Sequence, residues 1–365
     1  MENIKAFLKR KDIVISGKRY GIDALGAMAQ GLFCSLLIGT IVKTLGEQAG
    51  LPFLVDVGAY ASAMSGAAMA IAIGCALKAP PLVLFSLAAV GYAANALGST
   101  TLSGEPGAGG PLAVLFIAII AAEFGKAVSK ETKIDILVTP LVTILAGVGL
   151  SALIAPAIGT AATAVGNVIM WATDLQPFFM GIIVSVVIGM ALTLPISSAA
   201  ICAAFGLTGL AGGAAVAGCC ANMVGFAVLS FRENSWGGLV SQGLGTSMLQ
   251  MGNIVKNPRI WLPAILTSAI TGPIATCVFH LEMNGPPVSS GMGTCGLVAQ
   301  IGVWTGWLAP SELALANGAV AIVPGAMDWL GLLLISFILP AALCWAFGLW
   351  FRRIGWIKEG DLTLQ

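Results

Sequence analysis

Most of the chain consists of apolar runs long enough to cross a bilayer, separated by short charged or glycine-rich connections. A helix needs about 20 apolar residues to cross the hydrocarbon core. By this measure the pattern predicts about ten transmembrane helices. We expect them near residues 22–44, 56–77, 80–97, 112–128, 134–155, 177–195, 197–213, 214–231, 260–280 and 327–351. The least regular part is 197–231, a run of small residues that fits either two short helices or one broken pair.

Three segments interrupt this pattern, at residues 98–111, 233–258 and 281–326. The last two are too polar and glycine-rich for helices that face lipid, yet too apolar for ordinary solvated loops. Irregular backbone at membrane depth is tolerated only where it is buried in protein or lines a water-filled cavity. We therefore expect segments 233–258 and 281–326 to form re-entrant hairpins.

Two of the irregular stretches resemble each other. PISSAAIC at 195–202 and PPVSSGMGTC at 286–295 each contain proline, a β-branched residue, two serines and a cysteine among small residues. Paired interrupted segments in the two halves of a transporter are the best sequence pointer to its binding site. In a chain so rich in Ser, Gly and Ala, chance explains such a short match equally well, so it serves only as a hint.

Composition supports the membrane assignment. Hydrophobic residues make up 58% and charged residues 9% of the chain, with a mean hydropathy of +0.97. A soluble domain carries about 25% charged residues, so this chain could not cover its surface with charge in water. The sequence thus predicts an all-α, polytopic membrane protein. The net charge of +1 and the lack of a long basic tail argue against nucleic-acid binding.

Motifs for catalysis, metals and cofactors are missing from the sequence. There is no nucleotide-binding P-loop, no HExxH and no GxSxG, so we expect no enzyme activity, no catalytic residue and no cofactor. The eight cysteines lie in apolar or glycine-rich stretches without a CxxC pair, and the chain has one histidine. We therefore expect the cysteines to be packing residues and predict no metal site.

Lysine and arginine predict the orientation. Even numbers of predicted crossings separate the clusters at 5–19, 78, 126–133, 256–259 and 352–358, so all lie on one side. By the positive-inside rule that side is cytoplasmic. We expect both termini in the cytoplasm and the protein in the cell's inner (plasma) membrane. The predicted organisation is a cytoplasmic amphipathic segment at 1–20, a transmembrane transport domain at 21–351 and a cytoplasmic tail at 352–365.

The richest polar cluster lies in FHLEMNGPPVSSGMGT, residues 279–294. Ionisable groups at membrane depth are usually functional, so Glu282 is a candidate to accept hydrogen bonds from solute hydroxyls and His280 to donate or accept them. The alternative is a solvated helix end where both residues face water. The candidate solute-binding residues of this cluster are His280, Glu282, Asn284, Ser289, Ser290 and Thr294.

A second polar group lies between residues 222 and 258. Asn222, Gln250 and Asn253 carry neutral carboxamides of the kind that hold sugars, and we include them as candidate solute-binding residues. The alternative role for these side chains is hydrogen bonding from one helix to another.

The whole chain also resembles a known family. The runs PISSAAICAAFGLTGLAGGAAVAGCCANMVGF, SQGLGTSMLQMGNIVKNPRIWLPAILTSAITGPIA and NGPPVSSGMGTCGLVAQIG are similar to membrane (IIC) components of the phosphotransferase system. The resemblance is to the branch described as toxin regulators, like the perfringolysin O regulator. Its most specific pieces are GNIVKNP at 252–258 and GMGTCGLVAQ at 291–300.

This resemblance implies a homodimer in which a transport domain with re-entrant hairpins slides like an elevator against a scaffold domain. Better-known sugar carriers of this system pass a phosphoryl group from a cytoplasmic IIB domain to the bound sugar, often with a glutamate and a histidine nearby. His280 and Glu282 are the only such pair here, but the residues around them do not match those carriers. We expect no fused IIA or IIB domain, so separate subunits supply phosphate or transport proceeds without phosphorylation.

The sequence therefore predicts a transporter of a small polar solute, with sugars among the candidates. Its expected partners are the solute, the lipid bilayer, a second copy of the chain and separate IIA and IIB subunits. The alternative is a membrane sensor that regulates gene expression without transport, although the short basic loops offer little output surface. A passive channel would need a continuous polar lining that no single predicted helix provides.

Overall fold

The structure is a computed structural model that describes residues 2–364, without the side chains of residues 2–4 and Asn167. Within these residues the chain forms helices, turns and two isolated β-bridges. Seven described helices are long and apolar enough to span a membrane, or eight if one bent pair is a single span. The predicted all-α, polytopic membrane fold is therefore confirmed. The chain divides into two compact units, Met1–Ala162 and Thr163–Gln365.

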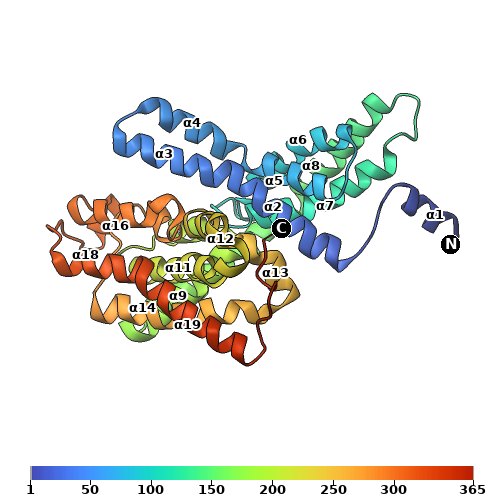
Figure 1. The fold of residues 1–365 in the computed structure, drawn as a ribbon. Coiled ribbons are helices and arrows are strands. Elements are labelled where there is room, and N and C mark those ends of the chain that lie inside the picture. The colour runs from blue at the N-terminus through green and yellow to red at the C-terminus, as the bar shows by residue number, and fades with distance from the viewer. Residues whose placement is uncertain (1, 365) are drawn as a thin grey trace. The chain divides into compact units, whose positions relative to one another are not determined.

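The first unit contains six helical segments and the start of a seventh (Figure 1). They are α1 (Glu2–Arg10), a continuous helix at Arg19–Ala49 that includes α2 (Ala24–Leu32) and α3 (Ile38–Ala49), α4 (Pro52–Ala63), α5 (Ser65–Ala76), α6 (Pro81–Gly98), α7 (Gly110–Val128) and α8 (Asp135–Thr173). The boundary between the two units falls inside α8.

Glycine lets helices of the first unit approach closely. A Cβ on Gly66 of α5 would lie 2.4 Å from the carbonyl oxygen of Gly91 on α6, and one on Gly91 would lie 2.2 Å from that of Gly66. Small residues of this kind replace the missing hydrophobic driving force between helices in lipid, because they allow close backbone packing. The glycine content of the chain thus serves helix packing here.

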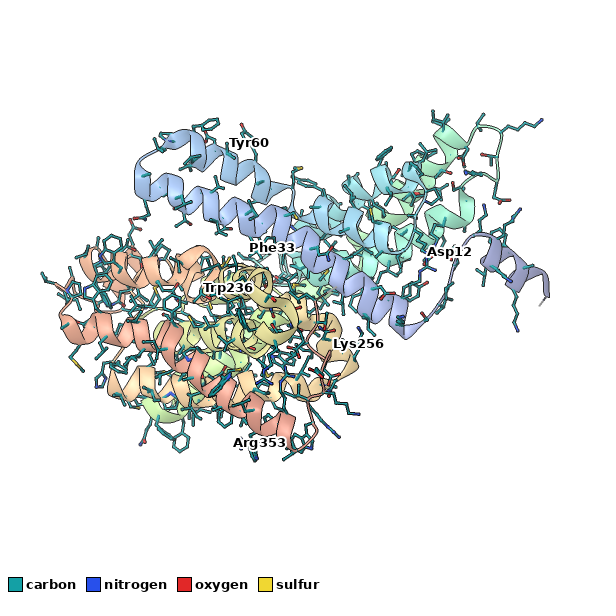
Figure 2. The ribbon with its side chains drawn as sticks, viewed as in Figure 1. Asp12, Phe33, Tyr60, Trp236, Lys256 and Arg353 are labelled. Carbon is teal, nitrogen blue, oxygen red and sulfur yellow. The ribbon has the colours of Figure 1, made fainter. Side chains whose placement is uncertain are left out.

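Charged residues tie the N-terminal segment, in which Asp12 follows α1, to the rest of this unit (Figure 2). Arg19 donates from Nη2 to Oδ2 of Asp12 at 2.7 Å and to the carbonyl of Leu77 at 2.6 Å. The buried ammonium of Lys126 donates to the carbonyls of Asp12 and Leu77 and pairs with Glu123 at 3.0 Å. Arg19 and Lys126 therefore donate hydrogen bonds to backbone carbonyl groups near helix ends, which lack partners within the helix.

The second unit contains the rest of the chain. Its longer elements are α9 (Pro177–Thr193), α11 (Gly209–Leu229), α12 (Phe231–Val240), a helix at Pro258–Val278 that includes α14 (Leu262–Pro273), α16 (Val298–Leu308) and a helix at Ala326–Arg353 made of α18 (Ala326–Leu333), a π-helical turn and α19 (Leu339–Arg353). Its short helices are α10 (Ser198–Ala204), α13 (Met251–Lys256), α15 (Pro287–Ser290) and α17 (Glu312–Ala316).

Helix α11 is the centre of the second unit, with α9, α14 and α19 packed around it (Figure 1). Its sequence GLAGGAAVAGCCANMVGFAVL consists almost entirely of small and apolar residues, and most of them are buried. A helix that is hydrophobic all round belongs in a core. The long spans predicted from 112–128, 260–280 and 327–351 agree closely with the observed helices.

Three predicted crossings differ from the structure. The predicted crossing at 56–77 is instead two helices, α4 and α5, which meet at a bend of 47°. The predicted crossing at 197–213 is instead the short α10 and the beginning of α11, because Gly206 and Gly209 adopt left-handed backbone with φ of +60° and +61°. The crossing predicted at 134–155 belongs to α8, which runs on through Pro156 to Thr173. Membrane helices tolerate proline where neighbouring groups satisfy the freed carbonyl.

Candidate functional site

The two interrupted segments that resemble each other in sequence lie together in the second unit. Helix α10 follows PIS at 195–197, and α15 follows the proline at 286, and the two short helices pack against each other. Ser198 donates from Oγ to the carbonyl of Gly291 at 2.7 Å. Ser290 donates from Oγ to the carbonyl of Leu207 at 2.8 Å. Serines of each segment therefore hold the backbone of the other.

A short antiparallel bridge joins the residues next to these segments, so that the paired region extends over 195–209 and 281–291. Gly209 and Met283 exchange both backbone hydrogen bonds, each with an N···O distance of 3.0 Å. Next to it, a Cβ on Gly213 would lie 1.7 Å from the carbonyl oxygen of Leu281. Only glycine at position 213 lets the extended stretch 281–283 lie against α11. The irregular backbone thus lies inside the helical unit, where its N–H and C=O groups find hydrogen-bond partners.

Residues of the 280–294 cluster differ in exposure. His280, with a left-handed φ of +44°, and Glu282 are exposed. Asn284 is buried and donates from Nδ2 to Oε2 of Glu282 at 2.9 Å. His280 and Glu282 lie in one irregular stretch between two helices, and the left-handed backbone at His280 separates it from the extended residues 281–283.

The hydroxyl groups of this cluster are buried beside the short helix α15. Ser289 is 5% exposed, and its hydroxyl has no partner among the described residues. Ser290 is bonded to the other segment, and Thr294 donates to the carbonyl of Gly243. Asn284 and Ser289 are therefore the buried polar groups of this cluster with hydrogen-bonding capacity left for a solute.

Asn222 lies in the middle of α11 and is fully buried. Its Oδ1 accepts from Nε1 of Trp261 at 2.9 Å and from Oγ1 of Thr193 at 3.2 Å. Its Nδ2 donates to the carbonyl of Gly218 at 3.1 Å and to Oγ of Ser268 at 3.3 Å. This carboxamide joins three helices, which is the interhelical role that the sequence left as the alternative for this group.

Gln250 and Asn253 face the C-terminal segment of the chain. Gln250 donates from Nε2 to the carbonyl of Leu362 at 2.9 Å, and Asn253 donates from Nδ2 to the carbonyl of Thr363 at 2.9 Å. The two carboxamides also bond each other at 2.8 Å. In this conformation neither meets the 280–294 cluster through a described hydrogen bond.

Sequence reasoning missed one buried carboxamide near this core. Gln300 of α16 is 8% exposed and donates from Nε2 to Oγ of Ser336 at 3.1 Å and to Sγ of Cys220 at 3.3 Å. Its Oε1 is buried without a partner among the described residues. The signal for it was a lone glutamine in the apolar run VAQIGVW, which begins at the end of GMGTCGLVAQ.

The described side chains contain no group of three His, Cys, Asp or Glu that could hold a metal ion. The site is instead built from neutral hydrogen-bonding groups, an exposed carboxylate and an exposed imidazole. Such a set can recognise hydroxyl-rich molecules by hydrogen bonds, because a few placed polar groups among apolar walls fix the orientation of a ligand.

Long apolar helices around a pair of buried, interrupted segments define a multi-pass membrane protein. A family model described as phosphotransferase system, EIIC, matches residues 22–364. The chain therefore belongs to the phosphotransferase-system EIIC family, whose members are membrane permease components. No curated protein and no solved structure gives a significant match.

Proposed function

We propose that this protein moves a sugar or a similar small polar solute across the membrane by alternating access. The observation that supports this most is the pairing of segments 195–209 and 281–291 inside the second unit. Paired interrupted segments form the substrate site in many secondary transporters, because their backbone and side-chain groups are not used up by regular helix bonding.

The proposed site centres on the 280–294 cluster. Asn284 and Ser289 offer buried hydrogen-bonding groups, and Glu282 accepts from Asn284 and has a second carboxylate oxygen for a solute hydroxyl. His280 lies two residues before Glu282 in the same irregular segment. Ser290 and Thr294 hold the neighbouring backbone in place through their bonds to Leu207 and Gly243.

Asn222, Gln250 and Asn253 belong to the proposal as a second group. The present bonds of Asn222 hold helices together, whereas those of Gln250 and Asn253 hold the C-terminal segment. In our proposal a rigid-body movement of the transport domain, as in an elevator, exposes the site to one side of the membrane and then to the other. The protein acts as a homodimer in the plasma membrane with both termini in the cytoplasm, and separate IIA and IIB subunits supply phosphate.

Solute binding by the purified protein in lipid nanodiscs tests this function. The probes are radiolabelled hexoses, hexitols, amino sugars and disaccharides, used as a panel. For a sugar that binds, Glu282→Gln and Asn284→Ala should each weaken affinity about 10-fold or more, because hydrogen bonds to charged or buried groups are lost. Asn253→Ala should weaken it as well if the second group takes part.

A matched control distinguishes an effect at the proposed site from a general effect of changing a surface charge. Glu312→Gln makes the same change as Glu282→Gln at an exposed position of the second unit and should leave affinity within twofold. A folded protein that binds none of the panel would contradict the transport proposal and favour the alternative of a membrane regulator of gene expression. Binding that none of the site variants changes would place the site elsewhere.

A further inference from the structure

The last residues of the chain return to the second unit instead of extending away from it. In Figure 1 the dark-red segment after α19 runs back beside α12 and α13. Its carbonyl groups at Leu362 and Thr363 accept hydrogen bonds from side chains of the 234–253 region. Here we call residues 356–364 the tail.

Asn234 binds the tail as a neighbouring β-strand would. Its Nδ2 donates to the carbonyl of Leu362 at 2.8 Å, and its Oδ1 accepts from the backbone N–H of Leu364 at 2.8 Å. These two bonds flank Thr363 on both sides, which is the pattern a peptide group makes in a β-ladder. The carboxamide of Asn234 thus binds the backbone of the tail directly.

A chain of carboxamides supports this contact. Asn253 donates to Oε1 of Gln250 at 2.8 Å, and Gln250 donates to Oε1 of Gln242 at 2.9 Å. Gln242 in turn donates to Oγ of Ser230 at 2.8 Å. All of these side chains are buried, and connected networks strengthen each member. The donors that meet the tail are therefore held in place before it arrives.

Side chains of the tail add apolar and charged anchors. Leu362 is fully buried and Ile357 is 2% exposed. Asp361 accepts from Nδ2 of Asn257 at 2.8 Å, and Trp356 stacks on Phe351 with ring centroids 5.2 Å apart. Removing such apolar side chains from water is favourable. Recognition of the tail therefore depends on its side chains as well as on its backbone.

We propose that the 234–257 region is a binding site for an extended peptide, and that the chain's own tail is its ligand. The carboxamides of Asn234, Gln250 and Asn253 recognise peptide groups, and the pocket at Leu362 supplies selectivity. The tail docks reversibly, because it is a short segment joined to the end of α19 and is held only by non-covalent contacts.

Residues of the tail also line an open, charged cavity of about 480 Å³. This cavity is lined by Arg232, Glu233 and Arg352 together with tail residues. Glu233 pairs with Arg352 at 2.7 Å through one carboxylate oxygen, while the other is buried without a partner among the described residues. Glu233 and residues of the tail thus line the same cavity.

A regulatory consequence rests on the function proposed above. Gln250 and Asn253 cannot hold a solute while their amide groups bind the tail. Docking and solute binding at these two residues therefore compete, and release of the tail makes them available. The peptide site itself does not depend on this consequence.

Direct peptide binding tests the proposal. The probe is a fluorescent synthetic peptide of residues 354–365, IGWIKEGDLTLQ, added to a purified variant that ends at Arg353. We expect saturable binding to this variant, and at least tenfold weaker binding to the full chain, whose tethered tail competes at an effective millimolar concentration. The same peptide with Leu362→Asp should bind at least tenfold more weakly, because Leu362 is buried.

Hydrogen exchange on the full chain gives a second test that does not need the truncated variant to fold. The amide of Leu364, which donates to Oδ1 of Asn234, should exchange at least about tenfold more slowly than in the free peptide. Asn234→Ala should remove most of that protection, whereas Asn317→Ala, which changes an exposed asparagine away from the tail, should not. Exchange at the free-peptide rate in the wild type, or no peptide binding by a folded truncated variant, would overturn the proposal. Neither readout involves a sugar.

Discussion

A single methyl group tests the packing of the extended stretch against α11. In Gly213→Ala the new Cβ would lie 1.7 Å from the carbonyl oxygen of Leu281. An ordinary contact begins at 3.4 Å, so that oxygen must retreat by about 1.7 Å. The obstacle is backbone, which cannot rotate away as a flexible side chain can. The stretch 281–283 must therefore move away from α11.

The size of the effect follows from two opposing terms. Alanine is a better helix former than glycine by about 1 kcal/mol. Overpacking in a well-packed core costs about 1–3 kcal/mol, and the two hydrogen bonds between Gly209 and Met283 are weakened as well. We expect Gly213→Ala to be destabilised by about 1–3 kcal/mol overall, because the steric and hydrogen-bond losses exceed the gain in propensity.

Unfolding by sodium dodecyl sulfate in mixed micelles, followed by tryptophan fluorescence, measures this difference. The matched control is Gly237→Ala in α12, where a Cβ would meet no atom within 4 Å. This control should be as stable as the wild type or slightly more stable. If Gly213→Ala proves at least as stable as Gly237→Ala, the close packing of the two segments is not present in the folded protein.

Three further predictions concern other parts of the molecule. Asn222→Leu should destabilise by about 1–2 kcal/mol, because Nε1 of Trp261 loses its acceptor, and the effect should shrink in a Trp261→Phe background; equal effects in both backgrounds would contradict this. Gln300→Met should change stability by less than about 1 kcal/mol, because it removes an unpaired buried acceptor along with two donated bonds; a much larger loss in the same unfolding assay would show an unrecognised partner. The hydrogen bond from Arg19 lowers the pKa of Asp12, so the ion pair stabilises the fold while Asp12 is ionised. Above pH 4, Asp12→Asn should lower the free energy of unfolding by less than about 1 kcal/mol, and this difference should disappear as the pH falls through the lowered pKa. A difference that stays constant down to pH 2 would rule out this ion pair as its source.

Hydrophobic patterning predicted the membrane fold and most helix positions, because a span of about 20 apolar residues leaves little choice of structure. The predicted span at 112–128 is α7, and the one at 327–351 lies within the helix at Ala326–Arg353. The break between α10 and α11 was not predictable in detail. Residues 197–213 are mostly small or apolar, and the left-handed turn at Gly206 and Gly209 has no separate mark in hydropathy.

The candidate site was predictable in part. The likeness of the two proline–serine segments pointed to a pair that the structure indeed brings together through Ser198 and Ser290. The contacts of Gln250 and Asn253 with the tail could not be predicted. They join residues more than 100 positions apart, and the short polar tail has no periodic pattern that would mark a docking segment.

A cryo-electron microscopy map of the protein in a lipid nanodisc, with the tightest-binding sugar of the panel, tests the central claim most directly. We predict sugar density within hydrogen-bonding distance of Asn284 and Ser289, with residues 281–291 at the depth of the lipid acyl chains. Residues 195–209 and 281–291 lying apart in the aqueous phase, with the sugar bound elsewhere, would contradict it.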